Sequence, residues 1–383
     1  MKVAIIADNY YPQVNGVVER IGNYRKYWIK KGHIVDIYSI TDHENVHKCN
    51  YLPIAEWFGY DKPGEKIPSF GMMYMTPKQI NEFRYQEYDI VWVAMASIVL
   101  QFLSCYLSTI GTKTKIFVSY HTDLIVLNDK YIRNKFFGDA LADLLYYIFT
   151  KALLPTIFNY SHLIGAPSVE PIKHLYNNII DKFIILPTGI DKDVFHPLKK
   201  KKLKHYSILY AGRIASEKNL KSLIIMLDKI KYLHLYIAGL GPETDELKIL
   251  FETKGFSDRV HWLGNLSKEK LCYYYNKVHI SIQPSNFETY GFTILESFAC
   301  GTPCFYREHE NLMKIYNKFN SNTYKFNLSI GQDFTDKDIN IIEYVLKNNN
   351  NIRLQLIKKI KTIDSWEDAS DKMIDIFQKI INE

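Results

Sequence analysis

The sequence predicts an α/β protein with two domains, each built around a parallel β-sheet. The first observation is the length of 383 residues, which exceeds what one ordinary hydrophobic core accommodates. The second is the opening pattern, in which apolar runs at residues 3–7 and 34–38 flank a helical stretch at 17–31. The third is that the same alternation begins again at 206–211, directly after the lysine-rich residues 199–204. We therefore expect residues 199–204 to be a linker between two sheets.

The composition is that of a globular protein with a basic surface. Hydrophobic residues make up 47% of the chain and charged residues 23%, and 48 Lys and Arg against 41 Asp and Glu give a net charge of +7. This charge favours an acidic partner: a sugar nucleotide, an anionic membrane surface or a nucleic acid, although the sequence contains no nucleic-acid-binding motif. The five cysteines follow no metal or disulfide spacing, which favours free thiols in a reducing compartment.

No membrane-spanning segment is expected. The apolar run at residues 3–7 ends at Asp8, so it is too short for a signal peptide. No stretch reaches the roughly 18 apolar residues that a transmembrane helix needs. The sequence therefore predicts a cytoplasmic protein, and the alternative is a peripheral position at a membrane surface.

The first domain is expected to continue as alternating strands and helices after an irregular region at 41–77. The predicted strands are 89–93, 115–119, 162–166 and 183–186, and the predicted helices are 98–110 and 171–177. The stretch 130–160 is aromatic, basic and helical. It either packs on the sheet or forms a membrane-facing or lipid-acceptor surface.

The most informative stretch of the second domain lies between a predicted buried strand at 278–282 and a predicted helix that begins at Thr293. Glu288 falls in the loop, and Glu296 falls in the first turn of the helix. The amides of residues 290–293 belong to a helix N-terminus, which favours an anion. A phosphorylated ligand would fit there, with one carboxylate left for sugar hydroxyls. The simpler interpretation is an ordinary turn between a strand and a helix.

A second loop of the same domain carries two cations after the strand at 206–211. Gly212 frees the backbone, and Arg213 and Lys218 are five positions apart across a tight loop. Both side chains can reach one diphosphate, arginine as a two-pronged donor and lysine as a point charge. The alternative is two exposed cations near a helix start.

The stretch from residue 286 to residue 296 resembles the signature of the retaining glycosyltransferases of family 4, also called glycosyl transferases group 1, which have the GT-B fold. Glu288 and Glu296 are separated by seven residues around an aromatic-Gly-aromatic core, and an Ala-Cys-Gly-Thr-Pro string follows at 299–303. The loops at 212–219, 239–243 and 187–191 are also similar to loops of that family. The resemblance is strong from about residue 185 to 303 and covers nearly the whole chain.

Two loops of the first domain point to one subgroup. The loop at 8–18, which contains Asn15 and Gly16, and the tetrad Ser-Tyr-His-Thr around His121 resemble those of sulfoquinovosyltransferases and phosphatidylinositol mannosyltransferases. In that subgroup the histidine contacts the donor sugar, and the resemblance implies this role for His121. Taken alone, a histidine after a strand is more often structural.

The resemblance implies two Rossmann-like domains that face a cleft, with a C-terminal helix that crosses back to the first domain. The implied boundaries are 1–190 for the N-terminal acceptor-side domain, 191–364 for the nucleotide-sugar-binding domain and 365–383 for the returning helix, where Trp366 suits the contact. It also implies a retaining transfer from a UDP- or GDP-sugar to a hydroxyl of a glycan or lipid, without metal. The Asp-x-Asp triplet at 191–193 is therefore discounted as a metal motif, and no cofactor is expected.

The resemblance assigns the candidate site residues as follows. Arg213 and Lys218 bind the diphosphate, Glu296 binds the ribose hydroxyls, and Glu288 and His121 contact the donor sugar, with Glu288 stabilising charge instead of acting as a nucleophile. The catalytic candidates are therefore His121, Glu288, Arg213 and Lys218. The donor-binding candidates also include Gly16, Leu263, Gly264, Leu266, Phe287, Tyr290, Gly291, Phe292, Thr293 and Glu296.

The sequence departs from the family pattern after Pro303, where residues 305–310 contain no glycine. Two rival functions follow: a nucleotide-sugar epimerase on the same fold, or a nucleotide-sugar-binding protein with weakened catalysis. The choice between UDP and GDP, the sugar, the acceptor, the linkage and the oligomeric state stay open.

Overall fold

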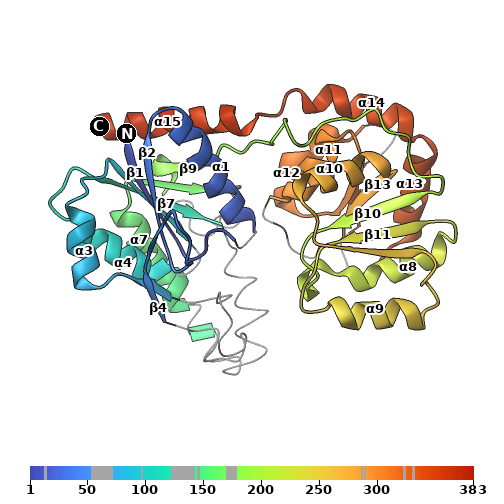
Figure 1. Cartoon of the computed structure of the whole chain (residues 1–383), viewed down its shortest axis with the longest axis horizontal. Helices are drawn as coiled ribbons and strands as arrows, with labels where there is room; N and C mark the ends of the chain where they lie inside the picture. Colours follow the sequence, from blue (N-terminus) through green and yellow to red (C-terminus); the bar gives the residue numbers. More distant parts are fainter. Residues whose placement is uncertain are drawn as a thin grey trace. The chain divides into compact units, whose positions relative to one another are not determined.

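The computed structural model describes residues 1–12, 15–52, 72–95, 98–121, 143–144, 147–169, 179–285, 288, 290–321, 325–329 and 333–383. The chain forms two compact units (Figure 1). Unit 1 contains residues 1–188 and 366–383, and unit 2 contains residues 189–365.

Unit 1 is built on a parallel sheet. Within the described residues, seven strands follow the order β3-β2-β1-β6-β7-β8-β9, and every neighbouring pair is parallel. Their bounds are β1 Lys2–Ala7, β2 Ile34–Ser39, β3 Val46–Lys48, β6 Ile90–Met95, β7 Lys115–Tyr120, β8 Leu163–Ala166 and β9 Phe183–Ile185. A separate antiparallel pair joins β4 (Asn50–Leu52) to β5 (Met72–Tyr74). The strands read as continuous apolar runs because both faces of a parallel sheet are buried.

The helices of unit 1 flank this sheet. They are α1 Gly16–Lys30, α3 Pro77–Arg84, α4 Ile98–Thr109, a π-helical turn Phe149–Leu153, α7 Leu154–Tyr160, a 3₁₀ turn Ile180–Lys182 and α15 Trp366–Asn382. Asn15 caps α1, since its side-chain oxygen accepts hydrogen bonds from the amides of Val17 and Val18 at 3.0 Å.

The C-terminal helix α15 packs on α1, as predicted. Phe377 is fully buried and lies 5.6 Å from the ring of Trp28 and 5.4 Å from the ring of Phe117, measured between ring centroids. The indole N–H of Trp28 donates to the carbonyl of Ser370 at 3.2 Å. Trp366, at the start of α15, makes an edge-to-face contact with Tyr24. These aromatic contacts make the last 18 residues part of unit 1.

Unit 2 is a second parallel sheet, with the strand order β12-β11-β10-β13-β14-β15. If its strands are counted from β10, this is the order 3-2-1-4-5-6 of a doubly wound nucleotide-binding fold. The strands are β10 Ser207–Ala211, β11 His234–Ala238, β12 Val260–Gly264, β13 Ile280–Gln283, β14 Cys304–Arg307 and β15 Asn327–Leu328. The two sheets confirm the predicted fold class of two Rossmann-like domains.

The helices of unit 2 lie between and after these strands. They are α8 Leu223–Lys229, α9 Thr244–Thr253, α10 Lys268–Lys277, α11 Phe292–Ala299, α12 Glu310–Tyr316, α13 Asp336–Lys347 and α14 Asn349–Ile360, with 3₁₀ turns at Ser216–Lys218, Leu220–Ser222 and Asn317–Phe319.

One prediction about the chain's organisation was wrong. Residues 199–204 are not a linker but lie inside unit 2. The amide of Leu203 donates to the carbonyl of Lys277 at 2.9 Å, and the ammonium of Lys202 donates to the carbonyl of Val278. The stretch therefore packs beside the entry to β13, which its lysine content did not indicate.

Some predicted elements cannot be compared with the structure. Most of the irregular region at 41–77, the first part of the aromatic stretch at 130–160 and the predicted helix at 171–177 lie outside the described residues. Among the residues that are described, no helix combines the length and the apolar character that a membrane crossing requires.

We predict that Phe377→Ala destabilises unit 1 by about 3–5 kcal/mol, because it leaves a cavity between Trp28 and Phe117. Urea unfolding followed by tryptophan fluorescence measures the change. Lys379→Ala, at an exposed position of the same helix, is the control and should stay within about 0.5 kcal/mol of the parent. Equal midpoints for the two variants would contradict the packing role of Phe377.

Candidate active site

The loops that carry the predicted donor-site residues of unit 2 leave the carboxyl ends of its strands. The strand order reverses between β10 and β13, because β11 and β12 lie on one side of β10 and the later strands on the other. Ligands of doubly wound sheets bind at this point. The side chain of Gln283, at the end of β13, donates to the carbonyl of Ala211, at the end of β10, at 2.7 Å. This buried hydrogen bond joins the two strand ends that flank the switch point.

The loop after β10 is held by backbone contacts with the loop after β11. The amide of Gly212 donates to the carbonyl of Ala238 at 3.0 Å, and the amide of Ile214 donates to the carbonyl of Leu240 at 3.1 Å. A Cβ atom on Gly239 would lie 1.9 Å from the carbonyl oxygen of Gly212. The two loops therefore pack backbone against backbone, and Gly239 is required for this contact, in agreement with the structural role expected of the 239–243 turn.

Arg213 and Lys218 both extend from this loop. Arg213 is exposed, and its carbonyl accepts a 2.6 Å hydrogen bond from the hydroxyl of Tyr210. Burial raises the pKa of Tyr210 well above its usual value, and the negative charges of Glu288 and Glu217 raise it further. Tyr210 therefore stays protonated and donates, which fixes the backbone at Arg213.

Lys218 and Glu288 form an ion pair that the sequence did not indicate. The ammonium nitrogen and the carboxylate oxygen Oε1 are 2.5 Å apart, and the side chains are 20% and 16% exposed. The hydroxyl of Ser285 donates to the same oxygen at 3.2 Å. The pair joins the loop after β10 to the loop after β13 across the switch point. An anionic ligand that binds to Lys218 has to share it with Glu288.

Helix α11 begins one residue earlier than predicted, and its start is well defined. Gly291 adopts a left-handed conformation with φ of 72° at the N-cap, and its carbonyl accepts hydrogen bonds from the amide of Ile294 at 2.9 Å and from the hydroxyl of Tyr316 at 3.1 Å. Phe292 and Thr293 form the first turn and are half-buried. The positive end of the helix dipole therefore lies at the loop that carries Glu288.

Glu296 lies in the second turn of α11 and contacts α10. The hydroxyl of Tyr275 donates to the carbonyl of Thr293 at 3.1 Å and to Oε2 of Glu296 at 3.5 Å. Burial and the charge of Glu296 raise the pKa of Tyr275 well above its usual value, so its hydroxyl remains a donor. Tyr275 was not predicted, because it stands in a run of three tyrosines that follows no motif.

The remaining unit 2 candidates lie near the same edge of the sheet. Gly264, at the end of β12, accepts a 2.8 Å hydrogen bond from the amide of Gly239, and Leu263 and Leu266 beside it are half-buried. Tyr290 is half-buried, with its ring 5.1 Å from that of Phe292. Phe287 lies outside the described residues.

The segment without glycine after Pro303 forms β14 and the start of α12. Ring nitrogen Nε2 of His309 lies 2.9 Å from the carbonyl oxygen of Ser285, so Nε2 carries the proton and donates. His309 therefore supports the start of the Glu288 loop from the side where the family carries glycines. No sequence motif indicated this contact.

In unit 1, Gly16 is the first residue of α1, in the loop after β1, and His121 directly follows β7. His121 is buried, and its Nε2 lies 2.7 Å from the hydroxyl oxygen of Ser119. The same hydroxyl oxygen accepts a hydrogen bond from the indole N–H of Trp92 at 2.6 Å. Burial lowers the pKa of His121 well below its usual value, and the positive charge of Arg20 adds to this. His121 is therefore a neutral, hydrogen-bonded side chain, and its contact with a donor sugar stays a prediction.

Comparison with known proteins identifies the second unit. Residues 191–361 match the model of the family described as "Glycosyl transferases group 1". Unit 2 is a group 1 glycosyl transferase domain. The chain therefore carries a glycosyl transferase domain, in agreement with the family resemblance of the signature loop.

Two curated relatives extend this similarity into the first unit. An alpha-monoglucosyldiacylglycerol synthase of Streptococcus pneumoniae is 25% identical over 330 residues, which cover 79% of this chain and 70% of the relative. A GDP-mannose-dependent alpha-mannosyltransferase of Corynebacterium glutamicum is 24% identical over 320 residues, which cover 79% of this chain and 71% of the relative.

Among solved structures, the sucrose-phosphate synthase of Thermosynechococcus elongatus superposes with a TM-score of 0.76 at 15% identity, covering 100% of this chain and 99% of that one. This last likeness shows the fold.

We predict that Gly239→Ala destabilises the glycosyltransferase by more than about 3 kcal/mol, because the added methyl group forces the two loops apart. Gly255→Ala is the matched control, since Gly255 also has a positive φ of 76° but has no atom within 4 Å of an added Cβ. The control should cost only the roughly 1–2 kcal/mol of a left-handed non-glycine residue. Thermal unfolding distinguishes the two, and equal losses would rule out the proposed close contact.

Proposed function

We propose that this glycosyltransferase moves a sugar from a nucleotide diphosphate sugar to a hydroxyl of a lipid or glycan acceptor, with retention at the anomeric carbon and without a metal ion in catalysis. The observation that carries the proposal is the pairing of Lys218 with Glu288 at the switch point of unit 2. The ammonium of Lys218 could bind a diphosphate and the carboxylate of Glu288 could bind a sugar. The two groups lie within hydrogen-bond distance of each other, beside the N-terminus of α11.

The diphosphate end of the donor would be held by positive charge. Arg213 and Lys218 offer charge-assisted hydrogen bonds to phosphate oxygens, and the first turn of α11 offers the positive end of a helix. These groups stabilise the negative charge that grows on the leaving group, which is the task that a divalent ion performs in other transferases. Glu296, fixed by Tyr275, would accept hydrogen bonds from the ribose.

The sugar would be transferred by attack on the same face from which the nucleotide leaves. The bond between the anomeric carbon and the diphosphate oxygen breaks, the acceptor oxygen forms the new bond, and the acceptor proton passes to the departing phosphate oxygen. Glu288 would bind the sugar and stabilise the positive charge near the anomeric carbon, without forming a covalent bond to it. In unit 1, His121 is the proposed contact for the donor sugar, as a neutral hydrogen-bonding group.

The proposal includes a lipid acceptor and a peripheral position of the protein at a membrane. The relative from Streptococcus pneumoniae is named for a diacylglycerol product. In unit 1, Leu103 and Leu107 of α4 and Ile110, the residue directly after it, follow helical spacing and are 47%, 44% and 47% exposed. Such a stripe suits contact with lipid, and the net charge of +7 suits an anionic cytoplasmic surface.

The defining experiment is donor turnover with a panel of UDP- and GDP-sugars in excess EDTA, with and without vesicles that contain diacylglycerol. We expect slow hydrolysis of one sugar from one nucleotide, and faster turnover with a glycolipid product when the vesicles are added. Co-sedimentation with the vesicles tests the membrane contact, and it should weaken in Leu107→Glu.

The outcomes of this experiment separate the rival functions. Conversion of the donor to its epimer without transfer would indicate an epimerase. Nucleotide binding without turnover under every condition would indicate a binding protein. Turnover that EDTA abolishes and a divalent ion restores would contradict metal independence.

We predict that Lys218→Ala weakens binding of the donor nucleotide diphosphate by about tenfold or more, because it removes a charge-assisted contact and leaves Glu288 without its cation. Isothermal titration calorimetry with UDP and GDP measures the loss. Lys221→Ala is the matched control, since Lys221 is a nearby exposed lysine that pairs with Glu246. Unchanged affinity in Lys218→Ala would remove Lys218 from the donor site.

A further inference from the structure

A cluster of three histidines lies at the edge of the second sheet that is opposite to the donor loops. His205 stands two residues before β10, His234 is the first residue of β11, and His261 is the second residue of β12. The donor loops leave the other ends of the same strands. His234 and Ala238 are the first and last residues of β11, so the two edges are about 13 Å apart.

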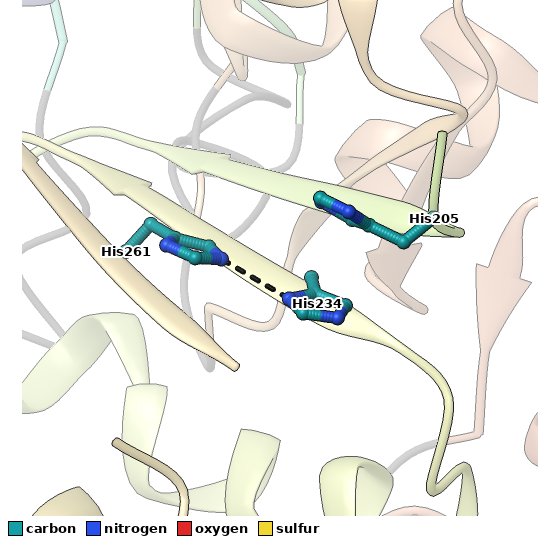
Figure 2. A group of neighbouring side chains, drawn as sticks. All are labelled: His205, His234 and His261. Atoms are coloured by element: carbon teal, nitrogen blue, oxygen red, sulfur yellow. Dashed lines mark hydrogen bonds between the residues drawn. The ribbon is translucent and has the colours of Figure 1, made fainter. Parts of the chain in front are cut away.

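Two of the three imidazoles, those of His234 and His261, come from adjacent strands and lie on one face of the sheet. Tyr236 pairs in register with His261 on β12, and His234 precedes Tyr236 by two positions, which places these side chains on the same face. His205 precedes β10, and the centroid of its ring lies 3.8 Å from that of His234. Figure 2 shows the three rings in a row across the neighbouring strands. Each histidine offers one ring nitrogen such that the three nitrogens lie within 4.8 Å of one another.

The distances suit coordination of one ion. Nδ1 of His234 and Nε2 of His261 are 3.1 Å apart (Figure 2). Two nitrogens on a tetrahedral zinc ion, each at 2.0–2.1 Å, would be about 3.3 Å apart. The nitrogen of His205 lies within 4.8 Å of the other two, so it has to approach by at most about 1.5 Å to reach the same separation. It lies outside the strand, in the stretch that leads into β10, where such an adjustment is local.

Tyr236 contacts two of the rings, and its hydrogen bond to His205 is of the kind that orients metal-bound histidines. Its hydroxyl lies 2.9 Å from Nε2 of His205, which leaves the other nitrogen of that ring for an ion. The ring of Tyr236 also stacks on His261, with centroids 4.4 Å apart and planes inclined by 25°.

We propose that His205, His234 and His261 bind a divalent transition metal ion, with zinc as the reference ion, at the amino edge of the second sheet. Imidazole nitrogens are preferred ligands of zinc, nickel and copper. Three histidines leave a fourth position for water or another ligand. The ion would join the chain before β10 to the starts of β11 and β12, and so stabilise unit 2 at a place remote from the donor loops.

The test is titration of the EDTA-treated and dialysed full chain with zinc chloride in a calorimeter. We expect one ion per chain, and about tenfold or greater loss of affinity in each of His205→Ala, His234→Ala and His261→Ala. Zinc should raise the unfolding temperature of the parent but not that of His234→Ala. His196→Ala is the matched control, because His196 is an exposed histidine of the same unit.

Cysteine thiols also bind zinc, so the test has to distinguish binding by thiols from binding by the three histidines. Sγ of Cys272 and Sγ of Cys300 are 3.7 Å apart in unit 2. Cys272→Ser should leave zinc affinity unchanged, and cobalt bound to the protein should show no thiolate charge-transfer band. No binding at 100-fold excess zinc over protein, zinc affinity equal to the parent's in the three histidine variants, or loss of binding in Cys272→Ser would overturn the proposal.

Folding and function are controlled separately. Circular dichroism and nucleotide binding by the three histidine variants show whether unit 2 is intact, because the donor loops lie at the other edge of the sheet. Turnover in EDTA tests the proposed function, whereas zinc affinity tests the histidine site. A negative result for zinc binding therefore does not contradict the proposed glycosyl transfer, and a negative result for turnover does not contradict the histidine site.

Discussion

The backbone contact between Gly239 and Gly212 is the constraint on which the donor end of unit 2 depends. A side chain at Gly239 would collide with the carbonyl oxygen of Gly212. The absence of that side chain lets the loops after β10 and β11 join through hydrogen bonds of their backbones. The loop after β10 is thereby held over the end of its own strand, and Arg213 and Lys218 extend from a rigid support. The glycines thus position charges that they do not themselves carry.

Charge across the switch point is balanced within the protein. Lys218 and Glu288 are half-buried, and each would be costly to leave without a partner in that position. Their pairing satisfies both and also connects two loops that carry different parts of the proposed donor site. Binding of an anion at Lys218 would weaken its contact with Glu288 and make the carboxylate available to the sugar. In the proposed function, the ion pair would thus couple binding of the diphosphate to binding of the sugar.

The two edges of the second sheet have different chemistry because of how parallel strands are built. At the carboxyl edge, glycines and a helix N-terminus present backbone donors, which suit anions. At the amino edge, His234 and His261 lie on neighbouring strands and His205 precedes a third strand, and one ring nitrogen from each lies within 4.8 Å of the others. Imidazole lone pairs suit a cation. The same six-stranded sheet thus carries the proposed anion site and the proposed cation site at opposite edges.

The sequence by itself determined the two sheets, the turn at Gly291 and most candidates for the donor site, because these follow from local patterns of apolar residues and glycines and from the resemblance of the loops to a known family. Tertiary structure decided the contacts between distant positions. Lys218 and Glu288 are 70 residues apart, Tyr275 meets Glu296 across two helices, and the three histidines meet only when β11 and β12 pair beside β10. It also placed the lysine-rich stretch at 199–204 inside unit 2. Such contacts depend on strand order and register, and a linear sequence of residues does not specify which distant side chains they bring together.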